Sequence, residues 1–162
     1  MPKLISIWLA VLTLALPAFA VPQVPEAGLR GQAEFRVLGV PIYEARLFTP
    51  NGQPLDWAGD YGLELTYLRP LTANALINST QNELVRLGHV TPNDLALGAC
   101  FQDVGVGDRY LAVPDGTDRI TFWRNGERVC TLDHPGFAHG FMSIFLGDNT
   151  QSAAFTRALL GR

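Results

Sequence analysis

An arginine and a tyrosine in one predicted hairpin are the first candidates for chemistry in this sequence. Arg36 and Tyr43 lie in EFRVLGVPIYEARLF, residues 34–48, which reads as two β-strands around a Gly-Val-Pro interruption. A two-residue turn at Gly39-Val40 fits a type II′ hairpin, because that turn favours glycine at its first central position. The implied register makes Arg36 and Tyr43 direct cross-strand neighbours on one face of the hairpin.

The chemistry that this pair predicts is the binding of a carboxylate. A guanidinium group donates two parallel hydrogen bonds to a carboxylate, and a tyrosine hydroxyl can add a third. The same face carries Leu38, Ala45 and Leu47, so Arg36 would be costly to bury there without an anionic partner. The alternative is an internal ion pair with no ligand, between Arg36 and one of three acidic residues: Glu34, Glu44 or Glu64.

Other residues associated with catalysis or metal binding form no recognised pattern. The sequence has no G-x-S-x-G and no H-E-x-x-H, and GVGDR at residues 105–109 precedes a predicted strand and is interpreted as a tight turn. His134 and His139 are interpreted as surface or helix-cap residues, with a metal or acid–base pair as the alternative. We predict no metal site and no cofactor.

The first 20 residues have the pattern of a secretory signal peptide. MPKLISIWLAVLTLALPAFA contains a lysine near its start, an apolar run over residues 4–16, and an A-x-A ending at Ala18 and Ala20. Cleavage after Ala20 would leave a mature domain of residues 21–162 in the periplasm or outside the cell. An uncleaved membrane anchor is the alternative, but a bilayer span needs about 20 apolar residues.

The two cysteines of the chain, Cys100 and Cys130, allow a single disulfide connectivity. An exported domain meets an oxidising compartment in which thiols pair. We therefore predict a bridge between them, provided that the fold brings their Cα atoms within about 7 Å. Two unpaired thiols in or near the core are the alternative.

The composition favours one domain and argues against charged macromolecular partners. The 162 residues are 48% hydrophobic and 17% charged, which suffices for one well-buried core but hardly for two. The formal net charge is −3, and cleavage would remove Lys3, the only lysine. Because no basic run remains, we expect neither nucleic acid nor an anionic lipid surface as a partner.

The elements that would position these residues follow from apolar periodicity, turn residues and helix caps. The predicted strands cover residues 34–48, 61–68, 108–116 and 118–132, after a loosely held Pro-rich lead-in that ends near Gly31. Asn125-Gly126 divides the last of these segments as a strong type I′ hairpin signal. One predicted helix begins at the cap Thr72 and ends at Gly88, and a second begins at the cap Thr91. Two further helices cover residues 134–147 and 149–161. Strands first and last, with helices grouped between and after them, favour an α+β fold with an antiparallel sheet.

Five segments of the chain carry a resemblance to a known family. They are FRVLGVPIYEARLF, LELTYLRPLTANALINSTQNELVRLG, GVGDRYLAV, ITFWRNGERV and FAHGFMSIFLGDNTQSAAFTRALLG. Together they resemble the bacterial exported branch of the chalcone isomerase-like family over essentially the whole mature chain. The resemblance implies an open-faced β-sandwich, in which a layer of helices covers a large antiparallel sheet and a ligand cleft lies between them. The family includes plant enzymes that cyclise chalcones and relatives that bind fatty acids without catalysis.

The resemblance also implies which residues would act. The enzymes use a strand arginine and a threonine near the C-terminal end, for which Arg36 and Thr150 are the candidates. They also use a tyrosine, a lysine and an asparagine around the helix that starts near Thr72, and that helix contains neither tyrosine nor lysine here. The fatty-acid-binding relatives keep the arginine and a nearby tyrosine as carboxylate holders, which are the roles of Arg36 and Tyr43.

We therefore expect an exported, non-catalytic protein that binds a small amphipathic carboxylate, such as a fatty acid, in the cleft between sheet and helices. Its expected ligand-binding residues are Arg36, Tyr43, Tyr67 and Thr150. The candidates to line an apolar cleft are Leu38, Leu47, Leu65, Tyr67, Phe141 and Ile144. Two alternatives stay open: an intramolecular lyase or isomerase acting on a chalcone-like or other small substrate, and an envelope protein-interaction domain.

The purified protein should give no measurable rate above background with a 2′-hydroxychalcone near neutral pH. Cyclisation needs an oriented phenolate and positioned donors for the developing enolate, and the tyrosine and lysine donors are missing from the predicted helix. Following the chalcone absorbance with time, with a plant chalcone isomerase as the positive control, checks this expectation. A stereoselective product would contradict it.

Overall fold

The computed structural model describes residues 21–162, so the predicted signal peptide lies outside the described residues. The elements in chain order are β1 (Ala27–Val37), β2 (Val40–Pro50), β3 (Gly62–Tyr67), α1 (Ala73–Arg86), α2 (Asp94–Gly98), β4 (Arg109–Asp115), β5 (Arg119–Arg124), β6 (Glu127–Asp133), α3 (Phe137–Leu146) and α4 (Ala153–Leu159). Each strand pairs antiparallel with the next, giving one six-stranded sheet in the order β1-β2-β3-β4-β5-β6. The predicted α+β class with an antiparallel sheet is confirmed.

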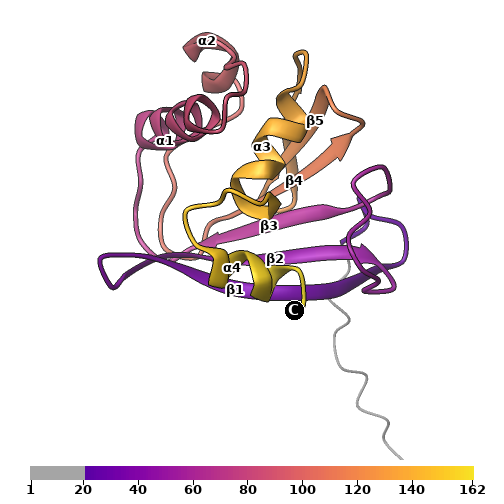
Figure 1. Cartoon of the computed structure of the whole chain (residues 1–162). Helices are drawn as coiled ribbons and strands as arrows, with labels where there is room; N and C mark the ends of the chain where they lie inside the picture. Colours follow the sequence, from indigo (N-terminus) through magenta and orange to yellow (C-terminus); the bar gives the residue numbers. More distant parts are fainter. Residues whose placement is uncertain (1–20) are drawn as a thin grey trace, which may run out of the picture.

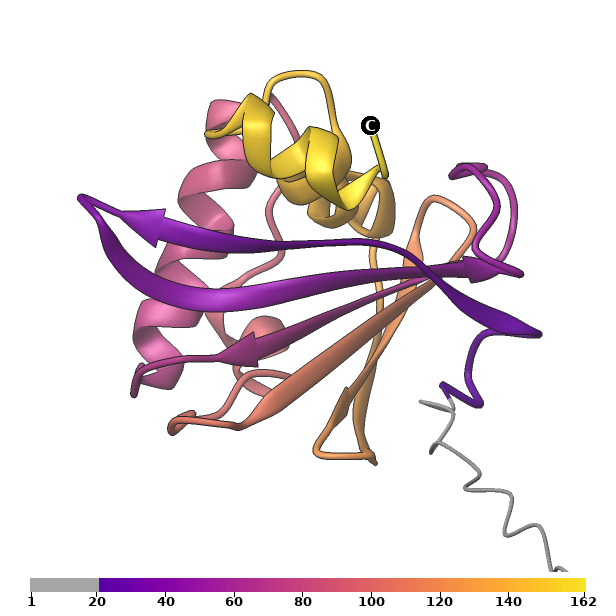
Figure 2. The ribbon, with the colours of Figure 1, turned by 90° about the horizontal axis from the view of Figure 1, so that it is seen from below.

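The helices cover one face of this sheet (Figures 1 and 2). Alternation along the strands produces that face, because successive side chains of a strand point to opposite sides. In β2, for example, Ala45 and Leu47 are fully buried in the main core, whereas Glu44 and Arg46, which alternate with them, form an ion pair outside that core. No helix within residues 21–162 is long and apolar enough to cross a membrane.

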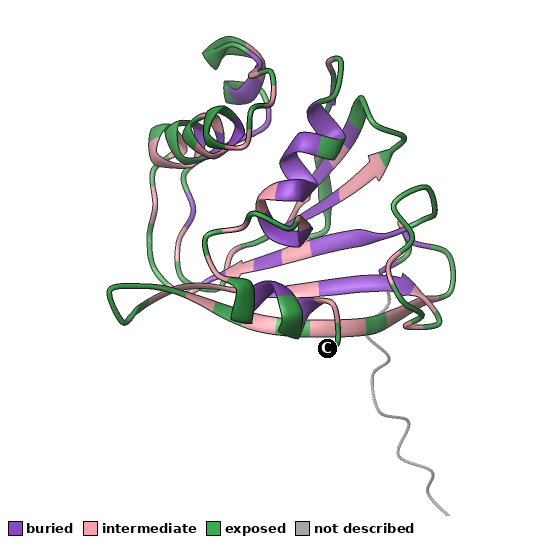
Figure 3. Ribbon diagram, in the orientation of Figure 1, coloured by how far each residue is buried: buried purple, intermediate pink, exposed green. Residues whose placement is uncertain are grey.

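The two C-terminal helices pack closely. Helix α4 lies directly against β1, where any side chain at Gly31 would collide with the backbone carbonyls of Ala158 and Leu159. Arg30 fixes the same contact by donating from Nε to the carbonyl of Leu160 at 2.8 Å. Helix α3 is buried along most of its length, as Figure 3 shows.

Helix α1 has a different environment from α3. Figure 3 shows more exposed and half-buried surface on α1, whose buried residues are Ile77, Thr80 and Leu84. Its C-terminal part packs on α3, where Leu84 approaches so closely that a Cβ at Gly140 would lie 3.0 Å from it. Helix α1 therefore joins the core through Ile77 and Leu84 and packs on α3 near its C-terminal end.

The predicted ends of α1 are confirmed, whereas the predicted N-cap of α2 is wrong. The hydroxyl of Thr72 accepts from the amide of Ala75 at 3.2 Å, and Gly88 takes a positive φ after the last turn. Helix α2, however, begins after Asn93, whose side chain accepts from the amide of Ala96 at 2.9 Å. The predicted cap Thr91 is wrong because asparagine at position 93 is a stronger N-cap than threonine and directly precedes the helix.

The β1–β2 hairpin has a different register from the predicted one. Leu38 and Gly39 both have positive φ, so they are the central residues of a type I′ turn, and a bulge follows at Phe35/Arg36. Tyr43 consequently pairs with Phe35, and Arg36 pairs with Pro41. The predicted pairing of Arg36 with Tyr43 is wrong, because a shift of one residue moves a side chain to the opposite face.

Burial explains the observed register. The observed register turns the apolar ring of Phe35 toward the helices and Arg36 toward solvent. The predicted register would have buried the guanidinium of Arg36, which costs free energy. Arg36 is 55% exposed, forms an ion pair with Glu34 at 2.5 Å and donates to the carbonyl of Gly39 at 2.9 Å. The ion pair is the alternative that the sequence left open.

The Pro-rich lead-in is also more ordered than predicted. Strand β1 already begins at Ala27, and Val21 and Val24 are buried in a small cluster with Phe48 and Leu111. Phe48 and Leu111 belong to the sheet face that points away from the helices. The valines are ordered because they cover apolar side chains that the helices cannot reach.

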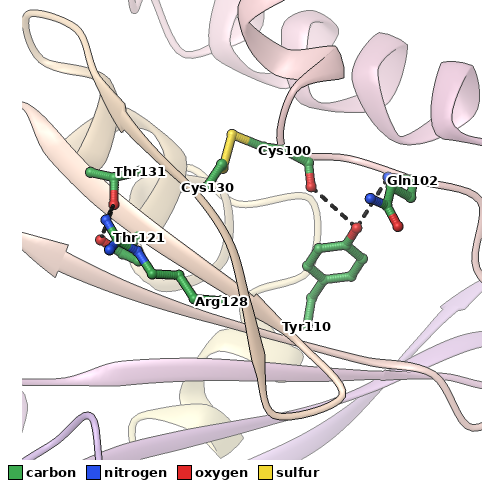
Figure 4. The surroundings of a disulfide bond; sticks show 7 residues. All are labelled: Cys100, Gln102, Tyr110, Thr121, Arg128, Cys130 and Thr131. Atoms are coloured by element: carbon green, nitrogen blue, oxygen red, sulfur yellow. Dashed lines mark hydrogen bonds between the residues drawn. A yellow bond between two sulfur atoms is a disulfide. The ribbon is translucent and has the colours of Figure 1, made fainter.

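A disulfide joins Cys100, just after α2, to Cys130 in the edge strand β6. Figure 4 shows the hydroxyl of Tyr110 beside it, accepting from the amide of Gln102 at 3.0 Å and pointing at the carbonyl of Cys100, 3.2 Å away. A two-way bridge between the backbones of Leu71 and Val104 closes the base of the segment that carries α1 and α2. The bridge therefore joins the two ends of the insertion, and the disulfide ties its return to the sheet.

Reducing the disulfide should destabilise the fold by about 2 to 4 kcal/mol, because it closes a loop with a sequence separation of 30. Thermal unfolding with and without reductant measures the effect, and the Cys100→Ala/Cys130→Ala variant should unfold like the reduced protein and ignore reductant. Two free thiols in denatured, unreduced exported protein would contradict the prediction.

Candidate ligand-binding site

A cavity of about 390 Å³ lies between the helix-facing side of the sheet and helix α1. Its floor is formed by strand residues: Phe35, Val37, Ile42, Tyr43, Leu63, Leu65, Tyr67, Tyr110, Ala112 and Phe122. One wall comes from α1, with Ala75, Leu76, Ser79, Thr80 and Glu83, and the other from α3 and α4, with Phe141, Ile144, Phe145 and Phe155. The volume lies within the range of about 300 to 1,000 Å³ that is usual for small-molecule sites.

A second hollow, on the other face of the sheet, is smaller. It measures about 170 Å³ and is lined by residues that include Glu64, Arg109 and Trp123. This volume is below the usual range for small-molecule sites, so the larger cavity is the better candidate.

Tyr43 stands at the centre of the aromatic part of the large cavity. Its ring stacks on that of Phe35, with the centroids 5.1 Å apart. Three further rings meet it edge-on at 6.1 to 6.2 Å, from Tyr67, Phe145 and Phe155. Such contacts add to the free energy gained by burial and hold the ring in one orientation.

The hydroxyl groups of the three cavity tyrosines differ in their partners. Tyr110 is occupied by the backbone around Cys100, as described above. Within residues 21–162, the hydroxyls of Tyr43 and Tyr67 form no hydrogen bond with another residue, although both side chains line the cavity. Burial raises the pKa of both phenols, that of Tyr43 further through the nearby Tyr67 and Glu83, so both remain protonated donors.

Thr150 lines the cavity, but its hydroxyl hydrogen is used in a hydrogen bond to Thr156. Thr156 donates its hydroxyl hydrogen to the carbonyl of Phe145 at 2.9 Å. Since that hydroxyl carries one hydrogen, the 2.6 Å contact between the two threonine oxygens must use the hydrogen of Thr150. Thr150 therefore offers the cavity only an acceptor.

Glu83 is the one charged residue among the described residues that line the cavity. Its carboxylate receives hydrogen bonds from Arg86, at 2.6 Å from Nη2 and 3.1 Å from Nε, and from the side-chain amide of Gln151. Partial burial opposes ionisation of Glu83, but the hydrogen bonds from Arg86 and Gln151 and the charge of Arg86 outweigh it and lower the pKa. This group joins α1 to the loop between α3 and α4.

The structure brings three of the four expected ligand-binding residues to the cavity. Tyr43, Tyr67 and Thr150 line it, whereas Arg36 lies outside it because the hairpin turns it to the other face. Among the expected apolar lining residues, Leu65, Phe141 and Ile144 line the cavity, but Leu38 is fully exposed and Leu47 is fully buried in the core.

Sequence reasoning missed Phe35 and Glu83. The alternation of Phe35 with Val37 was a usable signal for Phe35, but the wrong turn reversed the faces. Glu83 lies four residues after Ser79 and three before Arg86 on one helix. That spacing signals a surface ion pair, and nothing in it indicates a cavity beneath.

The one carboxylate of the described cavity lining is not tuned as a general base. A general base works best with a pKa near the operating pH, and Glu83 has a lowered one. Among the described residues, no group of three histidine, cysteine or carboxylate side chains is placed to hold a metal ion. What remains is an aromatic cavity with two phenol donors inside it.

Comparison with known proteins gives a structural relationship without a sequence relationship. No family model matches the chain, and no curated protein matches it in sequence. Among solved structures, a fatty-acid binding protein of Arabidopsis thaliana superposes with a TM-score of 0.61 at 13% identity, over 88% of this chain and 92% of that one. The two proteins share a fold. Membership of the bacterial exported branch of the chalcone isomerase-like family stays a prediction.

The Glu83–Arg86 pair should make stability depend on pH in acid. Because the pKa of Glu83 in the folded protein is lowered from 4.5, its contribution is complete above that pH and is lost as the pH falls through the folded value. The difference in melting temperature between wild type and Glu83→Gln should thus be constant near neutrality and shrink below about pH 4.5. Arg86→Gln should lose the same pH-dependent part. A difference that persists unchanged to pH 3 would show that the pair does not act this way.

Proposed function

We propose that this chain is an exported, non-catalytic protein that binds a small amphipathic molecule, such as a fatty acid or a related acyl compound, in the cavity between the sheet and α1. The apolar part of the ligand would lie along the aromatic floor and the wall formed by α3 and α4. The observation that carries the proposal is the cavity itself: about 390 Å³, lined predominantly by apolar and aromatic side chains.

The position of α1 supports a site that accepts a ligand. Its contact with α3 near Leu84 and Gly140 and its bridge at Glu83 lie toward its C-terminal end. The N-terminal half instead faces the cavity through Ala75, Leu76 and Ser79. A ligand that fills this space would bury apolar surface of the sheet and of α1 at the same time.

The fold similarity is a second, independent line of support for the proposed ligand class. The matching plant structure is described as a fatty-acid binding protein, and it covers nearly the whole of this chain. Fold alone does not imply function, so the argument rests on the cavity, and the fold similarity points to the same class of ligand.

Export is the part of the proposal that rests on the sequence. The signal-peptide pattern of residues 1–20 and the disulfide between Cys100 and Cys130 agree with an oxidising compartment. Native mass spectrometry of protein purified from its own host, followed by lipid extraction, would identify a ligand that travels with it.

Affinity for linear acyl compounds should rise with chain length by up to about 0.8 kcal/mol per added methylene until the cavity is full. Displacement of an apolar fluorescent probe by carboxylic acids, alcohols and methyl ketones of increasing length measures this. Ala75→Trp, which places an indole into the cavity from α1, should weaken binding of every member of the series at least about tenfold, or 1.4 kcal/mol.

Asn74→Trp is the matched control for the cavity-filling variant. Asn74 precedes Ala75 on the same helix but is exposed and does not line the cavity, so its replacement should leave binding unchanged. Absence of binding by every compound, or an equal effect of the two tryptophans, would rule out this cavity as the site.

A further inference from the structure

Two tyrosines on neighbouring strands line the cavity. Tyr43 of β2 and Tyr67 of β3 are direct cross-strand partners, with ring centroids 6.2 Å apart. Both side chains are largely buried, both line the cavity, and neither hydroxyl is satisfied by another residue within the described chain. Because both hydroxyls are accessible from the cavity, an acceptor atom of a ligand at this place would give each of them a hydrogen-bond partner.

The charges around these hydroxyls decide which acceptor fits. No arginine, lysine or histidine belongs to the described lining residues, and the polar ones besides Glu83 and the tyrosines are uncharged: Ser79, Thr80, Thr150, Gln151 and Ser152. The charge of Glu83 is felt at Tyr43, where it contributes to raising the phenol pKa. A carboxylate ion bound at Tyr43 would therefore face a carboxylate and no cation of the lining.

We propose that Tyr43 and Tyr67 donate hydrogen bonds to the carbonyl oxygen of an uncharged ligand, so that the cavity takes neutral carbonyl compounds with an apolar chain and discriminates against carboxylate ions. The inference rests on the proposed function and specifies its ligand class. A fatty acid enters such a site in its protonated form. Ketones and esters of the same chain length enter without losing a charge.

The physical reason is the cost of dehydrating an ion. Moving a carboxylate from water into an apolar cavity is expensive unless a cation or several donors compensate it. Arg36, which could have compensated it, is turned to solvent and paired with Glu34. Arg86 is bound to Glu83 and does not line the cavity. A neutral carbonyl loses much less hydration and still satisfies the two phenols.

The pH dependence of binding separates the two kinds of ligand. Among the described groups that face the tyrosine pair, Glu83 from α1 has a lowered pKa and is paired with Arg86, and Tyr110 from the sheet has a raised one. The lining residues from α3 and α4 do not titrate. The site therefore keeps its charge between pH 5.5 and 8.5, and any pH dependence in this range comes from the ligand.

Decanoic acid and 2-undecanone form a matched pair of probes, because a methyl group replaces the acid hydroxyl on the same chain. The affinity of the wild-type protein for 2-undecanone should be constant from about pH 5.5 to 8.5, whereas that for decanoic acid should fall about tenfold per pH unit. Isothermal titration calorimetry or probe displacement measures both compounds in the same buffers. Glu83→Gln should raise the affinity for decanoate relative to that for the ketone.

Variants of the tyrosines test the hydrogen bonds. Tyr43→Phe and Tyr67→Phe should each weaken binding of 2-undecanone about fivefold, as expected for one neutral hydrogen bond. Tyr61→Phe is the control, because Tyr61 is a buried tyrosine that does not line the cavity, and it should leave the affinity unchanged. Circular dichroism verifies that the three variants are folded alike.

The outcomes distinguish this inference from the proposed function. Decanoate that binds at pH 8.5 as tightly as 2-undecanone overturns the inference and leaves the acyl-binding function intact. Unchanged ketone affinity in both tyrosine variants likewise overturns it. If neither compound binds at any pH, the proposed function fails and the inference fails with it.

Discussion

The helix-facing side of the antiparallel sheet is apolar along β2, β3, β4 and β5, and it has to be covered. Strand alternation creates this face, since every second side chain of each strand points to the same side. Helices α3 and α4 follow the last strand and cover one part of it closely, as the collision that a side chain at Gly31 would make with α4 shows. The other part lies under α1, which arrives on an insertion between β3 and β4. The apolar face therefore forms the core where α3 and α4 cover it closely, and it forms the floor of the cavity where α1 lies over it.

Helix α1 is attached to the rest of the protein at the two ends of its segment, and these attachments keep the cavity beneath it open. The bridge between Leu71 and Val104 fixes the base of the insertion, and the disulfide of Cys100 fixes its return to the sheet. At the far end, Glu83 connects α1 to Gln151 and Arg86 donates to the carbonyl of Asn149 at 2.8 Å. These attachments place the helix over the sheet while its own side chains toward the sheet, such as Ala75 and Ser79, are too small to fill the space.

The polarity of the cavity follows from the strands that form its floor. Tyrosines at neighbouring positions of β2 and β3 bring neutral donors into an apolar space, and burial raises their pKa and keeps them neutral. The arginines of β1 and β2 point elsewhere: Arg30 toward the carbonyl of Leu160, Arg36 toward Glu34 and Arg46 toward Glu44. A site that binds through neutral hydrogen bonds gains selectivity from what it excludes, because charged competitors must lose their hydration without compensation.

The sequence by itself determined the class of fold and most element positions, because these depend on local signals, whereas the bridge between Cys100 and Cys130 also needed the fold to bring them together. Alternation marked the strands, Thr72 and Gly88 marked the ends of α1, and Asn125-Gly126 marked a tight turn. It also singled out Tyr43, Tyr67 and Thr150, all of which line the cavity. Only the tertiary structure decided which face each residue of the first hairpin occupies. The choice between a turn at Leu38-Gly39 and one at Gly39-Val40 depends on whether Phe35 or Arg36 is buried against helices that come much later in the chain. The cavity is decided at the same level, since its volume is set by how far α1 stands from the sheet and no local pattern in the sequence encodes that distance.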